Sequence, residues 1–326
     1  MMSRAATGDV WHAAGRFGLR VLARVGGVLL VIWGAATAGF FALRAIPGDP
    51  VDVMLGVHAQ VGERVREQIR ADWGLNDPLI VQYVNYLSRL VRGDLGQSYQ
   101  LRKPVADVLA QQAVATVQLT ALALIFAVVL ALAVALFARG RVAGRIASLL
   151  ELFVISSPSF WLGLVLLTVF GHQLGWFPVA SSRGFASLVL PALALALPLA
   201  GIMSQVLRQG LDDAETRPFA LSSRARGVNR QQFVWRHGLR HASSSTITLT
   251  GYLVGSLLSG AVLVETVFAR QGLGGVAVRA ILGRDLPVVL GIIVWAAIVF
   301  ALINLIVDIV YERLDPRVRA LAGVTA

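Results

Sequence analysis

The most regular feature of the chain is a series of apolar stretches, each long enough to cross a membrane as a helix. The hydrocarbon core of a bilayer, about 30 Å thick, takes roughly 20 apolar residues in helical form. Stretches of this length lie at 25–43, 114–138, 146–170, 185–207, 247–268 and 286–310. The pattern therefore predicts an all-α integral membrane protein with six transmembrane helices.

Charged residues are rare within these stretches. The first, second and fourth contain none, and each of the others contains one acidic residue, namely Glu151, Glu265 or Asp308. Each acid lies near a span end, so we expect its short side chain to reach the membrane interface. Pro191 and Pro198 lie inside the fourth stretch and predict kinks there.

The third stretch contains Pro158 among three serines, Ser156, Ser157 and Ser159. A helix break within a span is tolerated where neighbouring helices satisfy the freed backbone groups. The same break can also present polar side chains to a pathway through the membrane. Both interpretations stay open, and in the second these four residues are the candidate contacts for a transported substrate.

Arginines in the short connections indicate the orientation of the chain, because cytoplasmic loops are enriched in arginine and lysine. Three arginines fall within 139–145, whereas only one falls within 171–184. We therefore expect 139–145 on the cytoplasmic side, together with 208–246 and both termini. The prediction is a multi-pass protein of the cell (plasma or inner) membrane.

Segment 44–112 is predicted to be an external insertion between the first two spans. It holds eight basic and eight acidic residues, a balance that fits a translocated domain. Helical spacing of apolar residues predicts helices at 63–73 and 78–91, which form either a cap over the external mouth or a docking surface for another protein. At the two ends of the chain, 1–24 and 312–326 are predicted cytoplasmic segments.

The composition supports a membrane location. Hydrophobic residues make up 56% of the chain and charged residues 14%, against about 45–50% and about 25% in a typical soluble domain. The net charge of +11 arises mainly in the connections between apolar stretches. It therefore indicates orientation in membrane lipid, and no nucleic acid partner is expected.

The sequence carries no familiar catalytic pattern. Cysteine is absent, and the single lysine, Lys103, follows an arginine rather than the glycine of a phosphate-binding loop. His-Glu-x-x-His and Gly-x-Ser-x-Gly motifs are also absent. His237 and His241 have a spacing that can hold a metal, but arginines surround them, so we expect a basic helix face. We predict a transport subunit with no catalytic and no metal-binding residues.

The energy for transport is expected to come from another subunit. Ion-coupled transporters usually keep an ionisable group near the middle of the membrane, and none of the six stretches has one there. An ion-coupled secondary transporter remains the less favoured alternative.

The largest cytoplasmic loop, 208–246, is predicted to form two short helices around a glycine. Thr216 can cap the first helix, with Pro218 in its first turn, where a missing amide hydrogen costs least. Gly227 supplies a left-handed stop, and Asn229 caps the second helix.

The second helix of this loop is predicted to be amphipathic. Trp235, Leu239 and Ala242 recur on one side. The other side carries Arg236, His237, Arg240 and His241. The loop either anchors to anionic lipid as a solvated basic segment or docks as a helix–Gly–helix knob into the groove of a partner.

The loop also resembles the "EAA" loop of ABC importer permeases of the dipeptide/oligopeptide/nickel type. The similarity rests on FALSSRARGV at 219–228 and RHGLRHA at 236–242. Further motifs of that family follow the same order along the chain: PGDPV at 47–51, GLNDPL at 74–79, GDLGQS at 93–98, PSFWLG at 158–163, GAVLVETVF at 260–268, RDLPVV at 284–289 and DPR at 315–317.

The resemblance implies a permease subunit of an ATP-driven importer, with 113–311 as its permease domain. It implies a second permease subunit, two cytoplasmic ATPase subunits that bind ATP and Mg, and an external substrate-binding protein; no cofactor is expected on this chain. The implied cargo is di- or oligopeptides, with nickel, glutathione or haem as alternatives. The residues implied to couple the chain to the ATPases are Phe219, Ser222, Ser223, Arg224, Arg226, Gly227, Arg236, His237 and Arg240.

Overall fold

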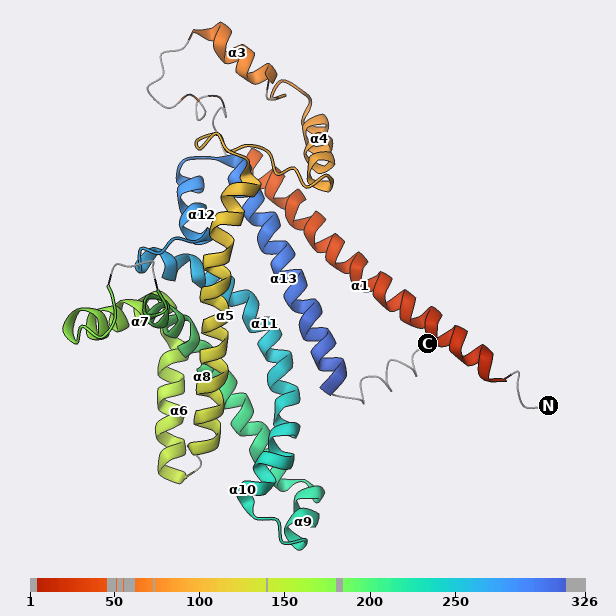
Figure 1. Cartoon of the computed structure of the whole chain (residues 1–326), viewed down its shortest axis with the longest axis vertical. Helices are drawn as coiled ribbons and strands as arrows, with labels where there is room; N and C mark the ends of the chain where they lie inside the picture. Colours follow the sequence, from red (N-terminus) through yellow and green to blue (C-terminus); the bar gives the residue numbers. More distant parts are fainter. Residues whose placement is uncertain are drawn as a thin grey trace. The chain divides into compact units, whose positions relative to one another are not determined.

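The computed structural model describes residues 5–45, 51, 55, 62–72, 74–138, 140–179 and 184–314. Every regular element in these ranges is a helix, as the sequence predicts. The chain divides into two compact units, one made of 1–106 with 283–305 and the other of 107–282 with 306–326. Figure 1 follows the helices along the chain from α1 to α13.

The helices of the first unit whose bounds the structure describes are α1 (Ala5–Arg44), α3 (Glu63–Asp72), α4 (Leu79–Val91) and the larger part of α13 (Leu286–Leu314). Helices α3 and α4 confirm the two predicted in the insertion. Helix α1 begins far before the predicted span at 25–43, so the expected N-terminal segment is helical from Ala5 onward. The predicted tail beyond Leu314 and the first four residues of the motif at 47–51 lie outside the described residues.

Helix α4 packs on α1 through aromatic side chains. The ring of Tyr86 stacks on Phe40 with centroids 5.5 Å apart, and the ring of Tyr83 lies 5.4 Å from Phe41. The hydroxyls of Tyr83 and Thr37 are 2.8 Å apart. Because this face turns to α1, the apolar residues at helical spacing on the other side of α4 stay exposed: Ile80, Val81, Val84 and Val91.

The loop before α5 is held by one buried carboxylate. Asp285, which is 2% exposed, accepts hydrogen bonds from the Ser98 hydroxyl and from the amides of Tyr99 (3.1 Å) and Gln100 (3.2 Å). The Gln100 amide nitrogen also donates to the Gly283 carbonyl at 2.8 Å. These bonds join the loop to the start of α13 within the first unit.

The second unit contains the remaining elements: α5 (Val105–Phe137), α6 (Arg141–Ser156), α7 (Ser159–Leu166), the π-helical η1 (Leu167–Gln173), α8 (Ala186–Thr216), α9 (Pro218–Ala225), α10 (Arg230–Phe233), the π-helical η2 (Val234–Gly238), α11 (Leu239–Val267) and α12 (Leu273–Leu282). Helix α8 packs against α6, α7 and α11 (Figure 1). Alanines spaced four residues apart line the core on α5 at 123, 127 and 131 and on α8 at 192, 196 and 200. Small side chains of this kind let helix backbones approach closely.

Two of the acidic residues in the predicted spans are buried inside the protein. Glu151 is 4% exposed and pairs with Arg208 at 2.5 Å and with the Ser204 hydroxyl at 2.7 Å. Glu265 is 1% exposed and accepts from the Thr116 hydroxyl at 2.6 Å and from the Gly274 amide at 2.8 Å. The prediction that both would reach the membrane interface is therefore wrong. A buried carboxylate is stable only with donors beside it, and neighbouring helices supply them here.

Four described helices are long and apolar enough to span a membrane: Arg24–Arg44, Val105–Phe137, Ala186–Thr216 and Leu286–Ile306. The predicted third span is two helices, Arg141–Ser156 and Ser159–Gln173, bent by 108° at Pro158. Ser157 there is extended, with φ −91° and ψ 131°, as the residue before a proline prefers. The predicted fifth span falls in α11, whose segment Gly255–Val267 is a shorter apolar helix. The count of six spans thus stays a prediction, with four helices and one bent pair in support.

Because Asp285 anchors the loop before α5, we predict that removing its carboxylate makes this loop open more often. Asp285→Ala leaves three donors without an acceptor, and one unsatisfied buried polar group costs about 1–3 kcal/mol. We expect the loop to open roughly tenfold more often or more. Because Lys103 is the single lysine, a lysine-specific protease reports this opening as the rate of cleavage in detergent.

Asp107→Ala is the matched control for this measurement. Asp107 is an exposed acid in the first turn of α5, where removing a favourable charge costs about 0.3–1 kcal/mol. Its cleavage rate at Lys103 should stay near that of the natural chain. Equal rates for the two variants would contradict an anchoring role for Asp285.

Candidate functional site

The loop at 208–246 lies at the end of the second unit where α8 ends and α11 begins (Figure 1). Helix α8 runs to Thr216, a single residue connects it to α9, and α10 continues through η2 into α11 without a break. The sequence prediction of two helical segments around a glycine is therefore confirmed. The second segment is the first part of a long helix rather than a separate short one.

The start of α9 differs from the prediction in one residue. Arg217, with φ −71° and ψ 152°, stands at the N-cap, and Pro218 follows at the first helical position. Thr216 instead ends α8, and its hydroxyl donates to the Asp213 carbonyl at 2.8 Å. The predicted Thr216 cap is therefore wrong, because the residue before a proline must be extended and Thr216 remains helical.

The predicted left-handed stop at Gly227 and the predicted N-cap at Asn229 are both confirmed. Gly227 has φ +77°, and its amide donates to the Arg224 carbonyl at 2.9 Å. The Val228 amide closes the turn by donating to the Ser223 carbonyl at 3.1 Å. The Asn229 side chain accepts from the Gln232 amide at 2.8 Å, which is the bond of an N-cap.

The buried face of the second helical segment differs from the predicted one at Trp235, whereas Leu239 and Ala242 lie at the core as predicted. Phe233, Val234 and Ala242 are buried, whereas Trp235 is 63% exposed. The Leu239 amide donates to the Val234 carbonyl, a bond across five residues. Such a π-helical turn holds an extra residue, so side chains rotate relative to a regular α-helix. The assignment of Trp235 to the apolar face is therefore wrong.

An inner cluster holds α9 against α8 and α10. Ala214, Ala220 and Phe233 are buried together with Val228 beside them. The Phe219 ring stacks on Phe233 with centroids 5.8 Å apart. The loop therefore has a small hydrophobic core of its own.

Two acids near the end of α8, Asp213 and Glu215, which the sequence analysis did not single out, hold basic residues of the loop; Asp213 pairs with Arg217 and His241. Glu215 accepts both Nε and a terminal nitrogen of Arg230, at 3.0 and 3.1 Å. A hydrogen bond from Arg224 reaches the Glu215 carbonyl at 3.2 Å. The Glu215 carboxylate raises the pKa of Arg230. The sequence signal that could have revealed these contacts is the acidic stretch at 212–215, shortly before α9.

The nine residues that the sequence analysis assigned to coupling divide into two groups. Ser223 is 2% exposed and belongs to the inner packing, and Phe219 is partly covered by Phe233. The other seven are exposed: Ser222, Arg224, Arg226, Gly227, Arg236, His237 and Arg240. Among these, Arg226, Arg236 and Arg240 form no ion pair within the described part of the chain. The exposed seven, called the coupling surface below, are rich in positive charge.

The predicted substrate contacts mark the bend between α6 and α7. The Ser157 hydroxyl donates to the Phe153 carbonyl at 2.7 Å, so it satisfies the end of α6. Ser159 begins α7 and lies next to Gly260 of α11, since a side-chain carbon on Gly260 would stand 3.7 Å from the Ser159 hydroxyl. Ser156 is exposed and Pro158 is the N-cap of α7. Their role in a substrate path stays a prediction.

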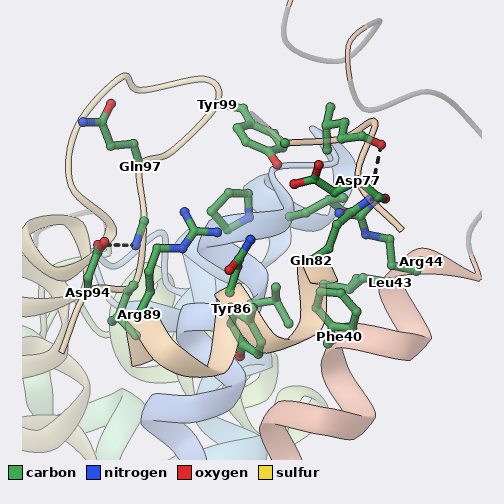
Figure 2. Close-up of a pocket in the computed structure, with 18 residues that line it drawn as sticks. Phe40, Leu43, Arg44, Asp77, Gln82, Tyr86, Arg89, Asp94, Gln97 and Tyr99 are labelled. Atoms are coloured by element: carbon green, nitrogen blue, oxygen red, sulfur yellow. Dashed lines mark hydrogen bonds between the residues drawn. The ribbon is translucent and has the colours of Figure 1, made fainter. Parts of the chain in front are cut away.

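A pocket of about 120 Å³ in the first unit was not foreseen from the sequence. Figure 2 shows Arg89 and Asp94 on one side of it, Arg44 and Asp77 on the other, and Tyr99 above. Apolar walls come from Phe40, Leu43, Leu75, Leu95, Leu286 and Leu290. Burial raises the pKa of Tyr99 to about 12, so its phenol is neutral at physiological pH.

The chain is similar to several known proteins. Residues 98–320 match the model of the binding-protein-dependent transport system inner membrane component, and residues 16–120 match the N-terminal model of that system's membrane component. The glutathione transport system permease protein GsiC of Escherichia coli K12 is 34% identical over 304 residues, which cover 92% of this chain and 98% of that protein. GsiC of Shigella dysenteriae serotype 1 gives the same values. A chain of the inward-facing MetNI methionine ABC transporter aligns with TM-score 0.48 at 19% identity over 64% of this chain and 96% of that one.

The fold and these matches define a multi-pass transport component of the inner membrane. The chain belongs to the family of binding-protein-dependent transport system inner membrane components, and it is a permease subunit of an ABC importer. The family resemblance inferred from the motifs is thereby confirmed.

Proposed function

We propose that this chain and a second permease subunit form the translocation path for short peptides that an external binding protein delivers. The support is the 34% identity over 92% of the chain to permeases named for glutathione transport. Glutathione is itself a tripeptide, so a peptide cargo fits this relationship better than nickel or haem. Two cytoplasmic ATPase subunits, which bind ATP and Mg, supply the energy in this proposal.

The coupling surface is the proposed docking site for an ATPase subunit. The observation that carries this proposal is a helix–Gly–helix segment with its own hydrophobic core and an outward face of arginines. Arginine offers charge-assisted hydrogen bonds to acidic groups and carbonyls on a partner. Helix α10 continues through η2 into α11 without a break. A movement of the docked segment is therefore transmitted directly to the long helix α11.

The proposed orientation places both termini, 139–145 and the coupling surface in the cytoplasm. The support is the arginine asymmetry of the connections. The external side then holds the insertion with α3 and α4, where a binding protein can reach it.

The first prediction of the proposed function concerns the energy source. Vesicles containing the chain with a second permease, ATPase subunits and binding protein should accumulate glutathione or a dipeptide when ATP is supplied, whereas vesicles with the chain alone should not. Uptake of radiolabelled peptide measures this outcome. ATP-independent flux through the chain alone would favour the ion-coupled alternative, and ATP-driven uptake of nickel or haem with no peptide uptake would refute the proposed cargo.

The second prediction tests coupling at Gly227. Its φ of +77° suits glycine, and no atom lies within 4 Å of the position of an added side-chain carbon. Gly227→Val therefore acts through backbone strain alone, about 1–2 kcal/mol, while Gly227→Asn is tolerated better because asparagine adopts this conformation. We expect Val to lower ATP-driven uptake several-fold and Asn to retain most of it.

Gly175→Val is the matched control for the Gly227 variants. Gly175 has φ +63° and equally open space, but it lies between η1 and α8 rather than in the coupling loop. It should insert and transport nearly as the natural chain does. Normal uptake by Gly227→Val with ATPase subunits still bound would reject the coupling role.

The third prediction tests orientation. Because the chain has no cysteine, single cysteines can be labelled without background. Gly140→Cys should react with a membrane-impermeant maleimide only from the cytoplasmic side, and Gln97→Cys only from outside. The reverse pattern at either position would refute the proposed orientation.

A further inference from the structure

The pocket in the first unit is lined by hydrogen-bond donors and by hydrogen-bond acceptors that are open to a ligand. One end offers donors and the other offers acceptors, and each end is built from residues of the insertion (Figure 2). This arrangement is independent of the coupling surface and of the serines at the bend.

Arg89 provides the donor end. It extends from α4 into the pocket (Figure 2) and forms no ion pair with a described carboxylate. The acid on the same side, Asp94, accepts the Gly96 amide at 2.8 Å. The other arginine, Arg44, lies over the Phe40 ring at 5.6 Å. Arg89 is therefore the cation with donors to spare, and a planar guanidinium suits a carboxylate.

Asp77 provides the acceptor end, and Gln82 holds the backbone beside it. The Gln82 amide nitrogen donates to the carbonyls of Leu75 (3.2 Å) and Asp77 (2.7 Å), which fixes the orientation of the amide. Its oxygen is buried and has no hydrogen-bond partner among the described residues. The Asp77 carboxylate lines the same side of the pocket. An ammonium group offers three donors, which suit the exposed carboxylate of Asp77.

The charges of the lining also select the class of ligand. Two arginines and two aspartates cancel, so the pocket favours neither a free anion nor a bare metal cation. Apolar walls between the polar ends suit a short aliphatic body. A volume of about 120 Å³ admits a ligand of one or two amino-acid residues.

We propose that this pocket binds the zwitterion of a short peptide, with its carboxylate on Arg89 and its ammonium group on Asp77. The inference rests on the proposed function, because it makes the external insertion a site that recognises the free ends of a peptide cargo. It assigns specificity to the insertion in addition to any selection by the binding protein.

The test uses the full chain in lipid nanodiscs and calorimetric titration with dialanine, its C-terminal amide and its N-acetyl derivative. Removing one charge-assisted contact weakens binding roughly 10- to 100-fold. We therefore expect dialanine to bind and both capped forms to bind more weakly by that factor. Arg89→Gln should abolish the preference for the free carboxylate while it binds the amide as the natural chain does. Asp77→Asn should abolish the preference for the free ammonium group in the same way.

Arg92→Gln is the matched control, because Arg92 ends α4 outside the pocket lining. It should keep both preferences. Equal binding of the three ligands, absence of dialanine binding at millimolar concentration, or an unchanged carboxylate preference in Arg89→Gln would overturn the inference. Unchanged binding of the amide by Arg89→Gln also shows that the variant is folded.

Peptide uptake by the assembled importer separates this inference from the proposed function. Uptake without selective binding at the pocket would refute the pocket alone. Selective binding without any peptide uptake would refute the proposed cargo of the importer and leave the pocket as a zwitterion site.

Discussion

Carboxylates removed from water organise this structure, because each must find its donors within the protein. Glu151 joins α6 to α8 through Arg208 and Ser204. Glu265 joins α11 to α5 and to the start of α12, and Asp285 holds the loop before α5 against the start of α13. In apolar surroundings, where burial alone distinguishes poorly between helix arrangements, such bonds fix which elements meet.

The close packing of the second unit depends on small residues around these polar contacts. Gly274 illustrates the constraint, since a side-chain carbon there would overlap the backbone of Val262 and approach the Glu265 carboxylate. The first turn of α12 can therefore pack in this way only with glycine at this position. Alanines at four-residue spacing on α5 and α8 have the same effect along the helices.

The two proposed sites use charge in different ways. Beside the coupling surface, Glu215 pairs with Arg230, while Arg226, Arg236 and Arg240 on that surface are exposed. In the pocket of the first unit, charges of both signs line a small volume between aromatic and aliphatic walls. The first arrangement suits docking to a protein surface, and the second suits a small zwitterion.

The sequence by itself determined the helical class, the apolar stretches, the family and the local geometry at Pro218, Gly227 and Asn229, because these depend on composition, spacing and the backbone preferences of single residues. It indicated a helix break at Pro158 but could not determine the 108° angle of the bend, the partners of Glu151 and Glu265 or the exposure of Trp235. It also gave no sign of the pocket, whose lining comes from segments near 40, 80, 95 and 287. Those features arise from contacts between residues far apart in the chain, and in η2 from a widened helical turn, so only the tertiary structure decided them.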